Sequence, residues 1–454
     1  MTLKNDAKVT VAGIVNVGQY AGATGELNVE GGTFTGNGEL RIADLGKGTM
    51  NITGGSASAA GLVNVGYGAG SEGKVTISNG TLTLPNSGNT FRIGRYGTGE
   101  VDVLEGGQLI VEKNTTQLGY YNTGYGTLKI DGGYAKLKKL DIGYAADSVG
   151  YFEMTDGTLD ILAVTDGNEI NVGYSGYGYA KISGGEVNLV SLRVGRENGS
   201  YGQLTIEGDG VMNLSSAARI SFNAGSEGKV FIKDNGQLNV TKELTIGNSD
   251  KGSVEVSGGQ LNANPIVIKD NGSTLKVTGG MVTSPSITIP QADSLDWTGG
   301  GMDIKTVTGD LNQKGGILSP GVSTIVAAEI LGNYTQASNG TVVIDVDQAN
   351  NIWDTITVSN GDLDLNGTLF VNFTDDQGPI DDFQIFNVNN GTMDLSGLTL
   401  AFPEWYSYAD AWMLSPTGLL MAVPDPNATP EPSTWALLIL GAAGMLYWRK
   451  RNSK

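Results

Sequence analysis

A unit of about 25 residues recurs eleven times between Val15 and Val282, and this repeat limits what the chain can fold into more than any other feature. Each copy contains a two-residue turn, Gly-Gly, Asn-Gly or Asp-Gly, and an apolar side chain follows two residues after the second glycine. A period of this length is typical of repeat architectures, in which each unit buries its apolar face against the next. Apolar residues alternate within each copy, which indicates strands rather than helices.

Two architectures fit three short strands per copy. In a propeller or meander, the glycine turns would close tight hairpins, whereas in a parallel β-helix each strand pairs with its equivalent one coil later. We favour the β-helix because each copy has three strands, not the four of a propeller blade, and because similar residues recur at one strand position. These residues are Val17, Val65, Ile93, Leu118, Ile142, Val172, Val194 and Ile246. The sequence therefore predicts an all-β fold over residues 1–304: a right-handed parallel β-helix of about 11 or 12 coils.

Composition removes several classes of function. Cysteine and histidine are both absent, so we expect no thiol nucleophile, no histidine-based triad and no metal site of the usual kind. The net charge of −19 disfavours nucleic acid as a partner, since phosphate binding needs a basic surface. We expect no enzyme activity, no cofactor and no metal.

The densest acidic stretch is a candidate source of two glycosidase carboxylates, which need to lie about 5–9 Å apart. Its members are Glu153, Asp156, Asp160, Asp166 and Glu169. We favour a solvated face for this stretch, because Asp156 belongs to a turn and Glu153 points outward from a predicted strand.

The first strand of each copy ends in glycine, as in Val63-Asn64-Val65-Gly66, and the next residue is aromatic or basic in several copies. These residues are Tyr67, Arg95, Tyr120, Tyr144, Tyr174 and Arg196. If the coils stack in register, they form one ladder. Such a ladder either stacks on saccharide rings or has a structural role, each ring covering the turn below it. The turn AGSEGKV occurs at Ala69–Val75 and again at Ala224–Val230, where Phe222-Asn223 precedes it; we expect the ladder to be interrupted there.

Residues 305–421 form a second predicted region, with fewer glycine turns. It contains "SPG" (Ser319–Gly321), "GNYTQ" (Gly332–Gln336) and the alternating strand "TVVIDVD" (Thr341–Asp347). This order resembles the later passenger region of autotransporter-type bacterial surface proteins. The resemblance implies either more β-helix or a β-sandwich-like cap.

The C-terminus has the pattern of a membrane anchor. A proline-rich linker (422–433) leads to an apolar segment (434–448), which we predict to be a short transmembrane helix, and to a basic tail (449–454) expected to stay cytoplasmic. The linker-helix junction reads Pro430, Glu431, Pro432, Ser433 and Thr434, and the basic stop consists of Arg449, Lys450 and Arg451.

This order of Pro-Glu-Pro, apolar helix and basic end resembles the PEP-CTERM sorting signal of Gram-negative envelope proteins, which some descriptions label an ice-binding protein C-terminal motif. The resemblance implies a membrane-embedded exosortase as partner, cleavage near Pro430–Pro432, and a final place at the cell surface or outside the cell. The N-terminal residues contain no apolar signal-peptide core, so we expect the true start to lie upstream of Met1.

These features favour a non-catalytic, membrane-anchored surface or matrix protein with a structural or adhesive role, with exopolysaccharide as a candidate partner. A secreted β-helix polysaccharide lyase or glycosidase is the alternative from another class. An ice-binding-like surface protein is a third, although the Thr-x-Thr pairs Thr33/Thr35 and Thr81/Thr83 do not persist along the repeats.

Overall fold

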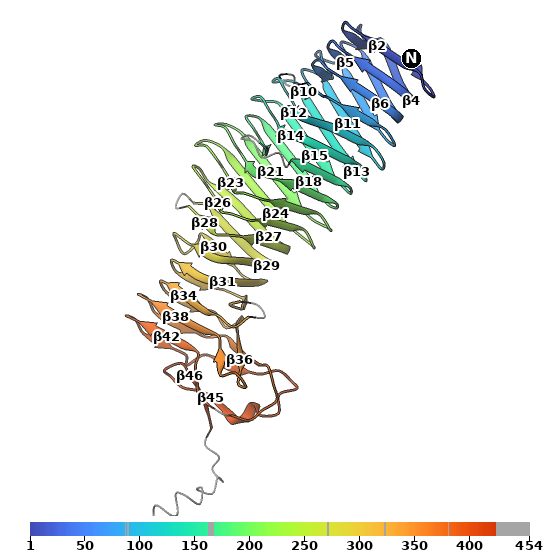
Figure 1. Ribbon diagram of the computed structural model, residues 1–454. Coiled ribbons are helices and arrows are strands. Elements are labelled where there is room, and N and C mark those ends of the chain that lie inside the picture. Colours follow the sequence, from blue (N-terminus) through green and yellow to red (C-terminus); the bar gives the residue numbers. More distant parts are fainter. Residues whose placement is uncertain are drawn as a thin grey trace, which may run out of the picture.

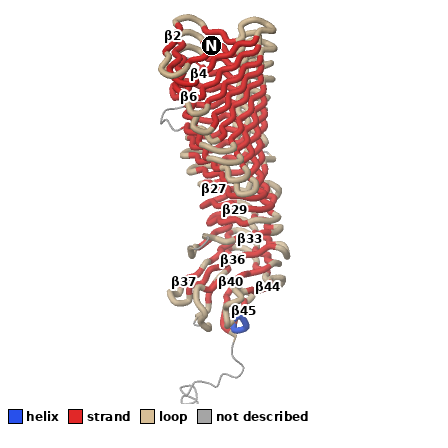
Figure 2. Tube along the Cα trace, turned by 90° about the vertical axis from the view of Figure 1, so that its right-hand side faces the viewer, coloured by secondary structure: helices blue, strands red, loops and turns tan. Residues whose placement is uncertain are grey.

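The computed structural model is a long rod built from parallel strands (Figure 1). It describes residues 1–86, 88, 90–161, 168–269, 272–321, 324–379 and 381–423. Within these residues, the only helical element is the single 3₁₀ turn η1 (Ala409–Ala411), drawn in blue near the C-terminal end in Figure 2. The rod is a β-solenoid of about 14 coils, which at about 4.8 Å per coil corresponds to a length of roughly 65 Å.

Each coil contributes one strand, or one part of a longer strand, to each of three columns. Column one contains β3 (Val15–Val17), β5 (Leu40–Ile42), β7 (Val63–Val65), β10 (Thr90–Ile93), β17 (Glu169–Val172), β20 (Ser191–Val194), β23 (Ala218–Ile220), β26 (Leu244–Ile246), β28 (Ile266–Ile268), β34 (Ala327–Leu331), β38 (Thr355–Ser359) and β42 (Phe386–Asn389). Column two contains β1 (Thr2–Leu3), β8 (Glu72–Ile77), β11 (Thr98–Leu104), β13 (Tyr125–Asp131), β15 (Val149–Met154), β18 (Tyr177–Ile182), β21 (Tyr201–Ile206), β24 (Glu227–Ile232), β30 (Leu295–Trp297), β32 (Leu311–Gln313), β35 (Tyr334–Gln336), β39 (Leu363–Leu365) and β43 (Met393–Asp394).

Column three and the longer strands complete the coils. Column three contains β2 (Lys8–Val11), β9 (Thr81–Thr83), β16 (Thr158–Ile161), β19 (Glu186–Leu189), β22 (Val211–Leu214), β25 (Gln237–Val240), β33 (Gly316–Leu318), β36 (Gly340–Asp347), β40 (Thr368–Phe373) and β44 (Thr399–Ala401). Columns two and three share β4 (Thr24–Gly36), β6 (Lys47–Ala59) and β27 (Gly252–Ala263); columns three and one share β12 (Gln108–Leu118), β14 (Tyr134–Ile142) and β31 (Gly301–Thr308); β29 (Thr274–Thr288) runs through all three.

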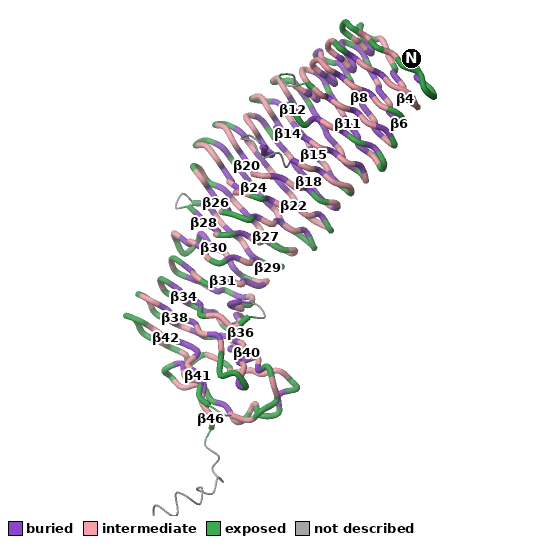
Figure 3. Tube along the Cα trace, viewed as in Figure 1, coloured by how far each residue is buried: buried purple, intermediate pink, exposed green. Residues whose placement is uncertain are grey.

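The predicted column of apolar residues is confirmed as a chain of register partners. Its members are Val17, Ile42, Val65, Ile93, Leu118, Ile142, Val172, Val194, Ile220, Ile246 and Ile268. All of them are buried, and the alternation of buried and exposed positions along each strand is visible in Figure 3. Ile42, Ile220 and Ile268 were missed, because Ala43, Ser221 and Lys269 stand where the other eight copies have glycine. Ala43 and Ser221 nevertheless adopt the left-handed conformation, with φ of 63° and 55°.

The three columns do not end at residue 304. Column one continues through β34, β38 and β42, column two through β32, β35, β39 and β43, and column three through β33, β36, β40 and β44. Of the two outcomes expected for this part of the chain, additional β-helix is the one found, and this is why the solenoid exceeds 11 or 12 coils. The domain boundary at 304 stays a prediction.

A small antiparallel sheet covers the C-terminal end of the rod. It consists of β41 (Phe383–Gln384), β45 (Trp412–Leu414) and β46 (Leu419–Ala422), while β37 (Ile352–Trp353) pairs antiparallel with β36. The ring of Phe373, at the end of β40, stacks on Tyr406 and Trp412 with centroids 4.4 and 5.2 Å away. These aromatic contacts close the apolar core of the solenoid.

The predicted membrane anchor falls outside the residues that the structure describes. This applies to the apolar segment 434–448, the basic tail 449–454, and the linker from residue 424 onward. Among the described residues, no helix is both long and apolar enough to cross a membrane.

The glycine after a column-one strand lies where the backbones of neighbouring coils approach closely. A Cβ on Gly66 (φ 73°) would lie 2.3 Å from the carbonyl oxygen of Thr98 on the next coil, whereas Gly70, with a similar φ of 76° in the same turn, has open space. We expect Gly70→Ala to lower the free energy of unfolding by about 1 kcal/mol through the left-handed conformation alone. Gly66→Ala should lower it by about 3 kcal/mol or more, because backbone must also move. Guanidinium titrations of both variants measure this difference, and equal losses would contradict the close coil approach.

Candidate functional site

The six predicted ladder residues occupy equivalent positions on six successive coils, each two residues after the end of a column-one strand and separated from it by one glycine. The Tyr67 ring is sandwiched between two guanidinium groups: the Cζ atoms of Arg41 and Arg95 lie 3.9 and 4.2 Å from the ring centroid. Further along, the Tyr120 and Tyr144 rings stack with centroids 5.2 Å apart and planes at 3°. We call this line the Tyr/Arg ladder.

The far end of the Tyr/Arg ladder has the same construction. Tyr144 and Tyr174 stack with centroids 5.0 Å apart, and the guanidinium carbon of Arg196 lies 4.4 Å from the Tyr174 centroid. Cation–π contacts of this kind stabilise by about 0.5–1 kcal/mol at exposed sites and by more when desolvated. The rings and guanidiniums therefore bind one coil to the next.

The middle of the ladder includes residues that the sequence interpretation missed. Between Arg95 and Tyr120, the guanidinium of Arg95 faces the Tyr96 ring at 4.9 Å, Tyr96 stacks on Tyr121 at 4.2 Å, and Tyr121 meets the edge of Tyr120 at 4.5 Å. The available signal was a tyrosine directly after the ladder residue in two consecutive copies, in Arg95-Tyr96 and in Tyr120-Tyr121.

The interruption expected at the second AGSEGKV turn is wrong. Phe222 occupies the ladder position of that coil, and its backbone N–H donates to Gly195 O, as Tyr67 N–H donates to Ala43 O. The guanidinium carbon of Arg193 lies 4.6 Å from the Phe222 centroid. At this ladder position, phenylalanine supplies a ring face without the hydroxyl.

Beneath the ladder lies a column of polar residues that point away from the core and are nevertheless buried. Asn64, Asp141 and Asn171 are each at most 1% exposed, although their strand neighbours on either side face inward. Arg41, which pairs in register with Asn64, also stacks on Tyr67. The ladder and its cations thus cover the outer face of the column-one strands.

The most concentrated group of charges belongs to this covered column. Asn171 Nδ2 donates to Asp141 Oδ1 at 2.7 Å and to Glu169 Oε1 at 3.1 Å. Lys139 Nζ lies 3.3 Å from Asp141 Oδ1 and 3.2 Å from Glu169 Oε1. Glu169 also pairs with Arg193, and it accepts from Arg196 Nη1 at 2.9 Å. We call these six residues the buried ion cluster.

The solvated face expected for the acidic stretch is wrong for Glu169. Its side chain is 5% exposed, because Glu169 begins β17 and faces cations of both adjacent coils. Asp166 lies outside the described residues. The position of Glu169 depends on which coil stacks on which, and this register is not contained in the local sequence.

Burial shapes the protonation of the cluster. Desolvation raises the pKa of Asp141 despite the nearby Lys139 and Asn171, and it lowers the pKa of Arg193 to about 10, with help from the neighbouring Arg196 and Arg219. At neutral pH Arg193 therefore stays charged. Two carboxylates, three cations and an amide contact one another here, and both carboxylates are buried, at 1% and 5% exposure, away from any substrate on the surface.

A further ladder, made of asparagine side chains, runs along column three and was also missed in the sequence interpretation. The side-chain amides of Asn188, Asn213, Asn239 and Asn262 form a chain of hydrogen bonds, with N···O distances of 3.0, 2.8 and 2.7 Å. Such asparagine ladders stabilise stacked in-register strands. The recurrence of asparagine in "VNL", "MNL", "LNV" and "LNA" was the available signal.

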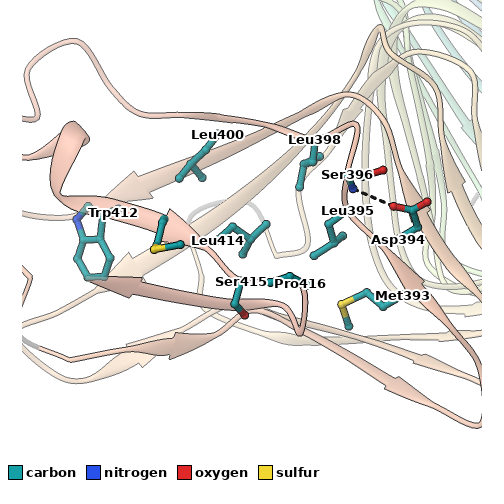
Figure 4. A pocket seen from close by; sticks show the side chains of 11 residues that line it. Met393, Asp394, Leu395, Ser396, Leu398, Leu400, Trp412, Leu414, Ser415 and Pro416 are labelled. Atoms are coloured by element: carbon teal, nitrogen blue, oxygen red, sulfur yellow. Dashed lines mark hydrogen bonds between the residues drawn. The ribbon is translucent and has the colours of Figure 1, made fainter. Parts of the chain in front are cut away.

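The structure also contains an apolar cavity at the C-terminal end, between the last coil and β45 (Figure 4). It has a volume of about 490 Å³, and Met393, Leu395, Leu398, Trp412 and Leu414 contribute to its lining. Its polar members, such as Asp394 and Ser396, bond to each other, since Ser396 N–H donates to Asp394 Oδ1 at 2.9 Å. Within the described part of the chain, no three acidic residues gather closely enough to hold a metal ion.

The buried ion cluster supplies a test of its structural role. Glu169→Gln leaves Lys139, Arg193 and Arg196 without their shared carboxylate, and breaking a buried ion pair from one side lowers the free energy of unfolding by about 3–5 kcal/mol. Glu153→Gln, on the outward side of column two, should change it by no more than about 0.5 kcal/mol. Guanidinium unfolding of both variants measures the difference; similar stabilities would show that Glu169 is not held as described.

Comparison with known protein families identifies a sorting motif at the C-terminus. Residues 428–451 match the family model of the PEP-CTERM protein-sorting motif, and this range includes the predicted motif Pro430–Thr434 and the predicted basic stop Arg449–Arg451. No curated protein matches the chain. The motif implies processing by an exosortase, association with the membrane, and sorting to the cell surface or extracellular space of Gram-negative bacteria. The chain is thus an all-β solenoid that carries a PEP-CTERM protein-sorting motif.

Proposed function

We propose that this protein is a non-catalytic structural and adhesion element of the bacterial surface or extracellular matrix, associated there with exopolysaccharide. The observation that carries the proposal is the continuity of the rod: one sheet of 43 strands extends from β1 to β44. A core without interruption and ladders on its outer faces make a stiff spacer, which suits a protein that holds something at a distance from the cell. Because the chain contains no cysteine, its stiffness comes from the core and the ladders rather than from disulfides.

The arrangement of charges supports a non-catalytic role. A β-helix lyase or glycosidase needs at least one acid or base that touches its substrate. The densest charge cluster of the described residues keeps Asp141 and Glu169 at 1% and 5% exposure, with both carboxylates engaged by cations and an amide. Such a cluster stabilises coil stacking and offers no reactive group to a polysaccharide.

The stacking geometry supports a structural role for the Tyr/Arg ladder as well. The ring faces of Tyr67 lie against two guanidiniums, and those of Tyr144 lie against Tyr120 and Tyr174. Saccharides stack on exposed ring faces, whereas these rings turn mainly edges toward solvent. The ladder thus fits the role of covering the turns better than that of a ligand site.

For attachment, we propose the arrangement predicted from the sequence. The segment 434–448 inserts in the membrane, Arg449, Lys450 and Arg451 hold its end on the cytoplasmic side, and the exosortase acts near Pro430–Pro432. The rod then lies outside the cell. An ice-binding role draws no support from the irregular threonine pairs.

Surface display tests the sorting part of this proposal, and the chain contains its own control. Replacing Pro430, Glu431 and Pro432 by alanine removes the motif, whereas the same change at Pro424, Asp425 and Pro426 alters a chemically matched Pro-Asp-Pro stretch. In the native host, the full chain and the 424–426 variant should be cut by protease added to intact cells, and the 430–432 variant should be protected. Equal cleavage of all three would contradict motif-dependent display.

A second measurement tests the absence of catalysis. The purified full chain, incubated with neutral and acidic polysaccharides, should release no reducing ends and no unsaturated sugars above a protein-free control. Release that grows in proportion to protein concentration, and that is lost in Glu169→Gln without loss of folding, would favour the lyase or glycosidase alternative.

A further inference from the structure

A second group of tyrosines lies on column two, on a different face from the Tyr/Arg ladder. It occupies four consecutive paired strands, β13, β15, β18 and β21, which lie side by side in Figure 1. Its members are Tyr125, Tyr151, Tyr177, Tyr179 and Tyr201, and we call them the tyrosine platform. They occupy outward strand positions, because the residues between them, such as Gly178 and Ala180, are buried.

The platform is continuous across its four coils. The ring centroids of Tyr125 and Tyr151 lie 5.2 Å apart, those of Tyr151 and Tyr179 lie 5.0 Å apart, and those of Tyr179 and Tyr201 lie 5.8 Å apart. Tyr125 and Tyr177 are 42% and 44% exposed. A strip of exposed aromatic surface therefore follows the rod axis for roughly 15 Å.

The platform differs from the Tyr/Arg ladder in how its rings are held. Tyr151 and Tyr179 stack at 13°, but Tyr125 is tilted by 36° to Tyr151 and Tyr201 by 50° to Tyr179, so the two end rings are not covered as the ladder rings are. The ladder rings at Tyr67 and Tyr174 are capped by arginines, whereas the one cation that faces a platform ring is Lys229, 5.3 Å from the Tyr201 centroid, among the described residues. Ring faces are thus available to a ligand on the platform.

Three cations near the platform are each paired with a carboxylate. Lys129 faces Glu100 at 3.6 Å, Lys181 pairs with Glu207 at 2.8 Å, and Lys229 pairs with Glu227 at 2.7 Å. Of the other acidic residues of these strands, Glu153 acts on Lys181 through its charge, and Asp131 accepts from Thr155 Oγ1 at 2.7 Å. The strip therefore offers phenol rings and hydroxyls without excess positive charge, while the chain as a whole carries −19 and repels polyanions. Because these cations are paired, the platform favours an uncharged ligand over a polyanion.

The dimensions of the strip favour a single extended chain over a folded protein. A stable protein interface buries about 800 Å² on each partner, and four coils about 15 Å long provide a much narrower aromatic strip. Tyrosine combines an apolar ring with a hydrogen-bonding tip, and Gln203 adds an amide, whose Oε1 accepts from Tyr201 at 3.0 Å. Sugar rings present the matching chemistry, with apolar C–H faces and hydroxyl edges.

We propose that the tyrosine platform binds a neutral polysaccharide chain, which lies along the rod axis with pyranose rings against the exposed faces of Tyr125 and Tyr177. This inference rests on the proposed association with exopolysaccharide and names its binding surface and the charge class of its ligand. Tyr151, Tyr179 and Tyr201 support the two exposed rings and supply hydroxyls to the sugar edges.

Affinity electrophoresis of the full chain in gels that contain hydroxyethylcellulose, xyloglucan or galactomannan tests the proposal. At least one of these neutral polysaccharides should retard the protein, and polygalacturonate should retard it less. The double variant Tyr125→Ala/Tyr177→Ala should raise the apparent dissociation constant about tenfold or more, since it removes both exposed ring faces. The matched control Tyr20→Ala removes a tyrosine that is 68% exposed but remote in sequence from the platform, and it should leave retardation unchanged.

A conservative variant separates the ring from the hydroxyl and guards against misfolding. Tyr125→Phe/Tyr177→Phe should keep most of the retardation, and all variants should unfold at the same guanidinium concentration as the full chain. Undiminished retardation of the double alanine variant would overturn the platform as the site while leaving the association with exopolysaccharide in place. Retardation by polygalacturonate alone, or by none of the neutral polysaccharides, would overturn the neutral ligand; surface display and the absence of catalysis are measured separately and are unaffected by that outcome.

Discussion

In-register parallel pairing between coils is the constraint on which every other feature of this rod depends. Once each strand pairs with its equivalent one coil later, every side chain has its own counterpart about 5 Å away along the axis. Inside the rod, this places valine, leucine and isoleucine on one another. Outside the rod, any residue type that recurs in the repeat forms a ladder, whether contact between identical side chains is favourable or unfavourable.

The outer ladders reduce the repulsion between like charges that in-register pairing would stack on one another. Like charges cannot be stacked at 5 Å without loss of stability, and on column two the rod alternates charge, as in Lys74 with Glu100 at 2.7 Å and Glu255 with Lys276 at 2.9 Å. Where Arg193 and Arg219 pair in register, the Phe222 ring lies near both guanidiniums. Arginine also alternates with tyrosine at Tyr67 and Tyr174, so that each cation meets a ring face. The buried ion cluster is the most compact form of the same solution, because three cations from the two adjacent coils share Glu169.

Much of this fold could be predicted from the sequence, because the glycine turns and the apolar alternation report backbone conformation locally. The glycine that follows the column-one strand did not identify the coils in which Ala43 and Ser221 take its place and adopt its left-handed conformation. After residue 304, glycine turns are too sparse to reveal that β34, β38 and β42 extend the same column. The sorting motif was recognisable because its signal lies in consecutive residues, Pro430 to Thr434. The burial of Glu169 and the tilt of the platform rings could not be predicted, since both depend on contacts between coils 22 to 30 residues apart.

The two sets of tyrosines illustrate why identical residues can have different roles on one rod. At the ladder position, the chain has just turned after a column-one strand, and the ring is laid against the ring or guanidinium of the next coil. On column two, the rings stand on a sheet face, and Tyr125 and Tyr201 are tilted relative to the stacked pair Tyr151 and Tyr179. Position relative to the turn, rather than residue type, decides whether an aromatic face is used within the protein or offered to a ligand.

Amide hydrogen exchange of a Tyr144→Ala variant tests most directly the claim that the outer ladder holds the coils in register. Tyr144 stacks on both Tyr120 and Tyr174, so its loss should increase exchange in the column-one part of β14 and in β17 while β25 and β40, on distant coils, stay protected. Retardation by neutral polysaccharides should be preserved. Unchanged exchange in β14 and β17, together with loss of polysaccharide retardation, would contradict this account and assign the ladder to ligand binding.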